Sequence, residues 1–327
     1  MEKNKNIFFA GMYFRENGPA LVNRNIVENL PKDISIITTS NRYIARLQFL
    51  IKVLCCDVVI FSALGYKDYE LWLIKVLKKK LIYIMHGFAE DDSVFLYNKE
   101  QKLLPFADLI LCVSEPFRQL VANRFPQYKE KLNVLTNGID WCVMINSISG
   151  VEIERQDNEI ILVGGGRIIK RNLNVCKAIQ MLNKSGYNLH VSVYGCYNEN
   201  DESQQIKNFP FVSYYGLVSH KELLMAMKKA RLFVQASKCE SFGLGVVESL
   251  ICGCDLVVSM NVGVISIISS ISSEEIIFDS SDIFEIKQKI ENVLRNPNNS
   301  RLIDGIDREE TSIETSVSKL IDYANNV

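Results

Sequence analysis

The sequence lacks the long apolar run that a membrane-spanning helix requires. In its 327 residues no stretch approaches the roughly 18 consecutive apolar residues of such a helix. The first apolar run, residues 7–10, is only four residues long before Arg15 and Glu16, which is too short for the core of a secretion signal. We therefore expect a cytoplasmic protein that is soluble or that at most lies on the inner face of the cell membrane.

Paired cysteines and clustered histidines are also absent. The nine cysteines are an odd number, no Cys-x-x-Cys motif occurs, and there are only three histidines. This pattern offers no zinc framework and no reason to expect disulfides. The acidic clusters Glu90–Asp92 and Asp279–Asp282 lack the flanking apolar strands of a metal-binding Asp-x-Asp motif. We therefore expect no metal and no cofactor.

A surplus of charge of one sign is likewise missing. The 37 basic and 38 acidic residues give a net charge of -1, which argues against a dedicated nucleic-acid-binding protein. The balance hides an asymmetry, because residues 1–150 carry 19 basic and 15 acidic side chains and the remainder carries 18 and 23. The most basic stretch, residues 40–84, is either a solvated face or a surface that attracts anionic lipid or phosphate-bearing substrates. Its cations are Arg42, Arg46, Lys52, Lys67, Lys75, Lys78, Lys79 and Lys80.

What the sequence does contain is a regular alternation of short apolar runs and longer amphipathic segments. This alternation is typical of strands and crossover helices in parallel sheets, and the length favours two domains. We predict an α/β protein with two doubly wound, Rossmann-like domains of six strands each, facing a central cleft. The predicted strands of the first domain are 7–10, 34–38, 58–62, 81–85, 109–113 and 132–135, and those of the second are 159–163, 189–194, 212–215, 232–235, 255–259 and 275–278.

A linker is predicted at residues 146–158, where the apolar pattern fades and Ser, Gly and charged residues appear. We place one domain at 1–148 and a second domain at 149–308. The tail, 309–327, has apolar residues at helical spacing and is expected to form a helix that can pack back on the N-terminal domain.

The most informative motif follows the predicted strand 232–235 and reads Glu-Ser-Phe-Gly-Leu-Gly-Val-Val-Glu. Its glutamates are eight positions apart, and a helix beginning near Gly243 would present free N–H groups to an anion. Carboxylates suit sugars because each one accepts several O–H hydrogen bonds. The candidate ligand-binding residues of this motif are Glu240, Ser241, Phe242, Gly243, Leu244 and Glu248.

A second motif opens the C-terminal domain directly after its first strand and reads Gly-Gly-Gly-Arg-Ile-Ile-Lys-Arg over residues 164–171. A glycine-rich backbone with cations on one short loop suits a diphosphate. It matches neither a Walker loop nor a dinucleotide-binding GxGxxG motif. Gly166, Arg167 and Lys170 are the candidates here, with Arg171 as the alternative if the register differs by one.

Together these motifs resemble those of the family-four retaining glycosyltransferases of the GT-B fold, in the type that builds bacterial surface polysaccharides. The family has a Glu-Phe-Gly-Glu signature before an Ala/Ser-x-x-x-Gly turn, here Ser249–Gly253, and a Gly-Arg…Lys element. An Asn-Gly-hydrophobic-Asp marker before the linker is similar to Asn137–Asp140. The resemblance adds His86 as a cleft-facing residue that orients the sugars, although a histidine after a strand can also be a plain loop residue. It also adds Gly18, and it implies that Gly18 and the candidate residues of both motifs bind the nucleotide-sugar donor. It likewise implies that 1–148 is the N-terminal acceptor-binding domain and 149–308 the nucleotide-sugar-binding domain.

Two departures from the family pattern stand out. The first strand-to-helix loop lacks a Gly-Gly pair, and residues 263–267 read Gly-Val-Ile-Ser-Ile where the family has Gly-Gly-x-Pro-Glu. The second departure leaves open how tightly this loop closes over the donor. His190, inside a predicted strand, and His220, at a predicted helix start, are interpreted as structural.

The resemblance implies a hexosyltransferase that moves a sugar from a nucleotide-sugar donor to a saccharide or lipid-linked acceptor with retention. The expected product is capsule, O-antigen of lipopolysaccharide, or exopolysaccharide. His86, Arg167, Lys170 and Glu240 are the expected catalytic residues, and the leaving diphosphate is expected to assist deprotonation of the acceptor. A catalytically degenerate binding partner and a nucleotide-sugar epimerase on the same scaffold remain alternatives, and a dehydrogenase is poorly supported because no acidic residue follows a GxGxxG motif.

Overall fold

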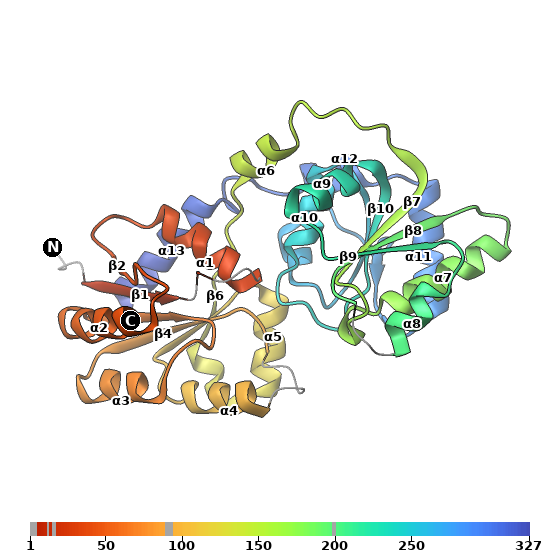
Figure 1. Ribbon diagram of the computed structural model, residues 1–327. Coiled ribbons are helices and arrows are strands. Elements are labelled where there is room, and N and C mark those ends of the chain that lie inside the picture. The colour runs from red at the N-terminus through yellow and green to blue at the C-terminus, as the bar shows by residue number, and fades with distance from the viewer. Residues whose placement is uncertain (1–4, 12, 15–17, 89–93, 198–200) are drawn as a thin grey trace. The chain divides into compact units, whose positions relative to one another are not determined.

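The computed structural model describes residues 5–11, 13–14, 18–88, 94–197 and 201–327 (Figure 1). The chain divides into two compact units, each described separately here. Unit 1 comprises Met1–Asp140 and Arg308–Val327, and unit 2 comprises Trp141–Asp307. Each unit contains one parallel six-stranded sheet, so the predicted α/β class and the two doubly wound sheets are confirmed.

Unit 1 has the strand order β2-β1-β3-β4-β5-β6. The chain adds β2 on one side of β1 and all later strands on the other side, so the topological switch point of this parallel sheet lies between β1 and β3. A ligand is expected at the carboxyl ends of these two strands. Figure 1 shows α2, α3 and α4 on one face of this sheet and α1 and α13 on the other. Its strands are β1 (Ile7–Gly11), β2 (Ser35–Ile36), β3 (Val58–Ser62), β4 (Lys80–Met85), β5 (Leu109–Cys112) and β6 (Leu132–Val134).

The helices of unit 1 follow from local signals as well as from packing. In α2, for example, the Asn41 side chain accepts hydrogen bonds from the N–H groups of Tyr43 and Ile44, as an N-cap residue does. The helices are α1 (Gly18–Asn29), α2 (Arg42–Cys55), α3 (Asp68–Val76), α4 (Val94–Leu103), α5 (Glu115–Arg124) and α13 (Ile313–Asn326), with a 3₁₀ helix η1 (Pro126–Lys131).

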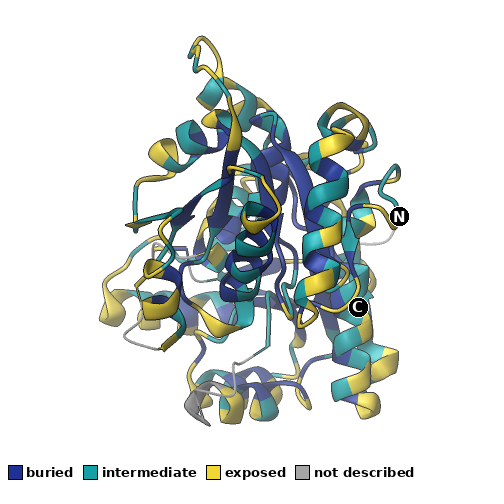
Figure 2. Cartoon of the chain, turned by 90° about the vertical axis from the view of Figure 1, so that its right-hand side faces the viewer, coloured by how far each residue is buried: buried dark blue, intermediate teal, exposed yellow. Residues whose placement is uncertain are grey.

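Unit 2 has the strand order β12-β11-β10-β7-β8-β9. The strands β8 and β9 are added on one side of β7 and the later strands on the other, so the switch point of this sheet lies between β7 and β10. The central strands β10 and β11 are almost completely buried, whereas the edge strand β9 has no buried residue. The buried residues follow the central strands through the layer between the helices (Figure 2). The strands are β7 (Gln156–Val163), β8 (His190–Tyr194), β9 (Val212–Gly216), β10 (Ala230–Gln235), β11 (Asp255–Ser259) and β12 (Ile276–Ile277).

Helices cover both faces of the sheet of unit 2, with α7, α8 and α11 on one face and α9, α10 and α12 on the other (Figure 1). The first set packs on an aliphatic core that includes Ile179, Val193 and Ile290. The helices are α6 (Trp141–Ile148), α7 (Asn172–Lys184), α8 (Asp201–Lys207), α9 (His220–Lys229), α10 (Leu244–Ile251), α11 (Ile283–Arg295) and α12 (Asn299–Asp304), with η2 (Ile168–Lys170) and η3 (Gly263–Ile267) as 3₁₀ helices.

The boundary between the units differs from the predicted position. The sequence predicted a break at 148/149 and a linker at 146–158, whereas the units meet at 140/141 and at 307/308. The reason is α6, which contacts α9 and α10 and therefore belongs to unit 2, and β7, which begins inside the predicted linker at Gln156. At the other boundary, α13 packs against α1 and so returns the chain to unit 1.

Candidate functional site

The glycine-rich loop after β7 holds Lys170 close to the end of the sheet. Gly164 has a φ of +102°, and a Cβ atom there would lie 2.7 Å from Cγ of Lys170, so the lysine stem rests directly on the glycine. Asn172 donates from Nδ2 to the carbonyl of Gly165 at 2.7 Å and fixes the turn. As a result the Lys170 side chain is only 13% exposed.

The loop after β10 brings Glu240 to the same edge of the sheet. Its chain is paired with residues 261–264, because Glu240 donates from its N–H to the Asn261 carbonyl at 3.0 Å and accepts from Gly263 N–H at 2.9 Å. Gly243 then caps α10 with a φ of +99°, and a Cβ atom on it would lie only 2.7 Å from Val262. Glycine is therefore required at 243 both by the backbone conformation and by the close approach of Val262.

Residues 263–267, which depart from the family pattern, still support the glutamate loop through their backbone. Residues 263–267 form η3, and the N–H of Val264 donates to the Phe242 carbonyl at 2.7 Å. The backbone of this segment is therefore part of the support of the glutamate loop, and these hydrogen bonds do not depend on the missing side chains.

Lys170 and Glu240 form an ion pair in the crevice where β7 and β10 are neighbours. Gln235, the last residue of β10, donates from Nε2 to the same carboxylate oxygen of Glu240 at 3.3 Å. Both charged side chains are mostly buried, at 13% and 24% exposure, so the pair is screened less than a surface pair. Two motifs separated by 70 residues in sequence therefore meet at the switch point of the unit 2 sheet.

Glu248 lies one turn into α10 and is oriented by His220. The Nε2 atom of His220 and Oε1 of Glu248 are 2.9 Å apart, and the glutamate side chain is 10% exposed. The hydrogen bond to Glu248 raises the pKa of His220 above its ordinary value. His220 was interpreted as structural from the sequence, and the structure adds that its partner is Glu248, a candidate donor-binding carboxylate.

A local signal places His220 at this position. Ser219 and Glu222 form a capping box, in which Glu222 N–H donates to Ser219 Oγ at 3.2 Å and Ser219 N–H donates to Glu222 Oε2 at 2.8 Å. The Ser-x-x-Glu spacing is visible in the sequence and fixes His220 as the first residue of α9. The contact with α10 is a consequence of packing and is not visible there.

The remaining candidates of unit 2 lie in different environments. Arg167 is exposed at the start of η2, and Arg171, the alternative, adopts a left-handed backbone with a φ of +57°. Gly166 is buried against Ser203 of α8. Ser241 and Leu244 are half-buried beside Glu240 and at the start of α10, whereas the Phe242 ring is 2% exposed and anchors the loop from inside.

In unit 1, His86 directly follows β4 and is part of a hydrogen-bonded chain. Its Nε2 atom lies 2.7 Å from Ser62 Oγ, and Ser62 in turn donates to Oδ1 of Asn23 on α1. Because the serine has only one proton, His86 must donate from Nε2–H, which fixes the neutral tautomer. Burial lowers the pKa of His86 to about 4, so the imidazole is neutral at physiological pH.

Gly18, the other unit 1 candidate, is the exposed first residue of α1. A Cβ atom on Gly18 would meet no other atom within 4 Å, so the surrounding packing does not require glycine there. Asn17, which precedes it, lies outside the described residues, as does the acidic cluster at 90–92. In the part of the chain that the structure describes, no group of three or more His, Cys, Asp or Glu side chains is placed to hold a metal ion.

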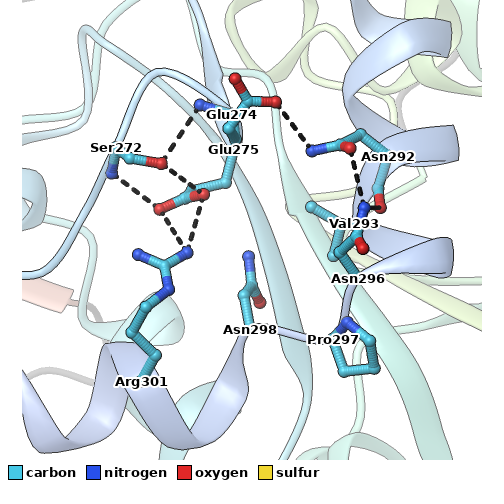
Figure 3. A pocket seen from close by; sticks show the side chains of 9 residues that line it. All are labelled: Ser272, Glu274, Glu275, Asn292, Val293, Asn296, Pro297, Asn298 and Arg301. Atoms are coloured by element: carbon cyan, nitrogen blue, oxygen red, sulfur yellow. Dashed lines mark hydrogen bonds and ion pairs between the residues drawn. The ribbon is translucent and has the colours of Figure 1, made fainter.

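A separate pocket of about 470 Å³ lies at the opposite edge of the unit 2 sheet, where β11 and β12 begin (Figure 3). Its polar side chains are engaged with one another. The buried Glu275 carboxylate pairs with Arg301 at 3.0 Å and accepts from the Ser272 N–H at 2.7 Å. Glu274 accepts a hydrogen bond from Asn292 at 3.1 Å. This cluster fastens α11 and α12 to the segment before β12, and it lies away from the strand ends that carry the candidate site.

The chain also resembles known proteins. Residues 146–305, nearly all of unit 2, match the family described as glycosyl transferases group 1. No curated protein matches the chain in sequence.

Solved structures match over almost the full length of the chain. HepE of Anabaena in complex with UDP and glucose matches with a TM-score of 0.68 and 14% identity, over 99% of this chain and 100% of HepE. The sucrose-phosphate synthase of Thermosynechococcus elongatus matches with a TM-score of 0.68 and 13% identity, over 97% of this chain and 98% of the synthase. A trehalose-6-phosphate synthase studied for glycosyl transfer with retention matches with a TM-score of 0.68 and 11% identity, over 98% of this chain and 99% of that synthase. At these identities the likeness shows the fold, which is GT-B.

Proposed function

Because the chain is a GT-B glycosyltransferase with a group 1 domain at residues 146–305, we propose that it transfers a sugar from a nucleoside diphosphate sugar to a saccharide or lipid-linked saccharide, with retention of configuration. The observation that carries this proposal is the meeting of Lys170, Glu240 and the N-terminus of α10 at one switch point. A cation and a helix N-terminus suit a diphosphate, and a carboxylate beside them suits the hydroxyls of the attached sugar.

Each side chain then has a distinct role in binding the donor. Lys170, with Arg167 on the same loop, neutralises the diphosphate. Glu240 accepts hydrogen bonds from hydroxyls of the transferred sugar, and Glu248 accepts them from the nucleotide ribose. HepE, which shares the fold, was solved with UDP and with UDP-glucose, and this supports a nucleotide-sugar donor.

The proposed chemistry is a same-face displacement. The acceptor oxygen bonds to the anomeric carbon while the bond from that carbon to the diphosphate oxygen breaks, and the acceptor proton passes to an oxygen of the leaving diphosphate. Lys170 stabilises the charge that develops on the diphosphate, which is the usual role of a preorganised cation. A double displacement would need a carboxylate nucleophile, and Glu240 suits this poorly because its charge is engaged by Lys170.

We further propose that the acceptor is built at a membrane as a precursor of surface polysaccharide. The faces of α2 and α3 that point away from the sheet carry large exposed apolar side chains among basic ones, and no helix of the described residues is long and apolar enough to cross a membrane. An amphipathic surface of this kind binds in the plane of an anionic bilayer. The exposed apolar residues are Tyr43, Ile44, Leu47, Leu50, Ile51 and Leu54 on α2, and Tyr69, Trp72 and Val76 on α3.

The donor is tested by thermal shift with a panel of nucleotide sugars, because a ligand that binds the folded state raises the melting temperature. The stabilising donor is then incubated with an oligosaccharide acceptor, and the anomeric configuration of the product is read by NMR. Transfer with retention supports the proposal. Binding without transfer identifies a degenerate binding partner, and interconversion of the sugar without an acceptor identifies an epimerase.

Membrane attachment is tested by flotation with phosphatidylcholine vesicles that contain or lack phosphatidylglycerol. We expect flotation only with the anionic vesicles and less of it after Leu47→Gln with Trp72→Gln. Val143→Gln with Tyr215→Gln removes two exposed apolar side chains from unit 2 and is the matched control. Equal flotation of both double variants would exclude this surface.

A further inference from the structure

A pocket of about 310 Å³ lies in unit 1 at the switch point of its sheet. It is bounded by the carboxyl end of β1, by the loops after β2 and β3, and by the first turns of α2 and α3. Ligand sites of open parallel sheets are found at such a place, and the volume is at the lower end of the range for small-molecule sites.

Three of the side chains that line this pocket are cations, namely Arg42, Arg46 and Lys67. Within the described part of the chain, no carboxylate forms an ion pair with any of them. The one carboxylate in the lining, Glu70, accepts the N–H of Lys67 at 2.7 Å and the hydroxyl of Tyr69 at 3.2 Å, and burial raises its pKa. The lining therefore has more positive than negative charge.

The floor of the pocket is formed by aromatic rings. Phe61 and Tyr66 stack with their ring centroids 5.8 Å apart and their planes at 14°, and Phe49 packs 6.3 Å from Phe61. Ala63, next to the end of β3, has a φ of +66°, a conformation that a non-glycine residue keeps only where the surroundings enforce it. An apolar floor reduces screening by water, so cations at its rim interact more strongly with an anion than they would on an open surface.

We propose that this pocket binds a phosphate or diphosphate group of the acceptor. Arginine presents a planar fork of donors that matches phosphate oxygens, and lysine adds a point charge. The N-termini of α2 and α3 both face the pocket, and since Asn41 already accepts two of the first N–H groups of α2, this helix contributes mainly through its dipole. This inference rests on the proposed transferase function and narrows its acceptor to an anionic class.

The phosphate can be attached to a lipid or to a soluble sugar. The exposed apolar residues of α2 lie on the helix whose first turns line the pocket, so a phosphate bound there is adjacent to the surface proposed to enter the bilayer. The pocket would recognise the phosphate of a lipid and the phosphate of a soluble sugar through the same cations. The experiment below therefore tests the two kinds of acceptor separately.

The test titrates inorganic pyrophosphate into the full chain by calorimetry. Wild type is expected to show two sites, one at Lys170 and one in this pocket. Arg42→Gln with Arg46→Gln should weaken only the second site, by about tenfold or more, because two charge-assisted contacts are lost. Lys52→Gln with Lys75→Gln removes the same charge from α2 and α3 outside the lining and should bind as wild type. Arg42 and Arg46 are exposed, so folding should persist, and circular dichroism verifies it.

Two further arms use geranylgeranyl diphosphate in phosphatidylcholine vesicles and glucose 1-phosphate in solution. Weaker binding of the arginine double variant in the vesicle arm alone identifies a lipid-linked acceptor, and weaker binding in the soluble arm alone identifies a sugar phosphate. Unchanged pyrophosphate binding by the arginine double variant, or equal loss in the lysine control, overturns the inference. If Lys170→Gln binds pyrophosphate and nucleotide sugars as wild type does, the donor assignment fails while the pocket stands.

Discussion

The ammonium group of Lys170 pairs with the carboxylate of Glu240, and the two residues come from loops that follow neighbouring strands of the unit 2 sheet. The pair holds two groups of opposite charge where the donor is proposed to bind. A diphosphate can interact with the ammonium group of Lys170, and a sugar hydroxyl can donate a hydrogen bond to the carboxylate of Glu240.

Lys170→Gln should lower kcat by about 100-fold or more, since it removes the cation that stabilises the leaving diphosphate. Lys184→Gln, an exposed lysine at the end of α7, is the control and should leave the rate unchanged. Steady-state kinetics with the stabilising donor measure both variants. A Lys170→Gln enzyme with normal turnover would remove this residue from the mechanism.

His220→Ala should raise the KM for the donor by roughly five- to tenfold with little change in kcat, because His220 orients Glu248 and does not contact the reacting atoms. His220→Gln, which can still donate a hydrogen bond, should restore part of the affinity. His190 is a matched control, as it lies 2.7 Å from Glu159 at the beginning of β8. His190→Ala should lower the melting temperature without changing KM, and a parallel KM increase in both alanine variants would contradict the assignment.

Gly243→Ala should destabilise the protein by about 2 kcal/mol more than Gly186→Ala does, because it adds overpacking to backbone strain. Both glycines have a φ near +100°, but a Cβ atom at 243 would lie 2.7 Å from Val262, whereas at 186 nothing lies within 4 Å. Urea denaturation measures the difference. Val262→Ala in the Gly243→Ala background should recover part of it, and equal destabilisation by the two glycine variants would show that Val262 can move aside.

The lowered pKa of His86 leads us to expect that the folded protein is less stable in mild acid. Its pKa is about 4 in the folded protein and about 6.5 when unfolded, so between these values the unfolded chain binds more protons. The contribution of the neutral ring is therefore complete above about pH 6.5 and declines towards pH 4, by up to ~3 kcal/mol at ~1.4 kcal/mol per pH unit. His86→Gln should flatten this part of the stability profile, as measured by urea denaturation from pH 4 to 7.5. An unchanged slope would mean that His86 already binds its proton near pH 6.5.

The sequence predicted the repeating elements better than the irregular ones. The predicted helix at 42–55 coincides with α2, where an Asn cap precedes a long amphipathic segment. In contrast, α8 was not predicted, because its seven residues contain one apolar side chain, Ile206, and thus no period. The predicted linker at 146–158 includes only the end of α6, and the apolar start of this helix, residues 141–145, was assigned to no element, since so short a run does not distinguish helix from strand.

The candidate site shows the same limit. Lys170 and Glu240 were each recognised from their own motif, but their contact depends on β7 and β10 being neighbours, and the order of strands is a property of the folded sheet. The contact of His220 with Glu248 was not predicted, because the two residues are 28 positions apart and lie on different helices. The cations and aromatic residues of the unit 1 pocket come from several segments, so composition indicated a basic region without indicating a cavity.

The return of α13 to unit 1 affects the order in which the protein can fold. Ile139 and Ser312 form a parallel bridge, with Ile139 N–H donating to the Thr311 carbonyl at 2.9 Å and Ile313 N–H to the Ile139 carbonyl at 3.1 Å. Unit 2 is one continuous segment and can form as soon as it leaves the ribosome. Unit 1 begins earlier in the chain, yet α1 lacks its helical partner until residues 313–326 have been synthesised, so the first unit to be translated is the last to be completed.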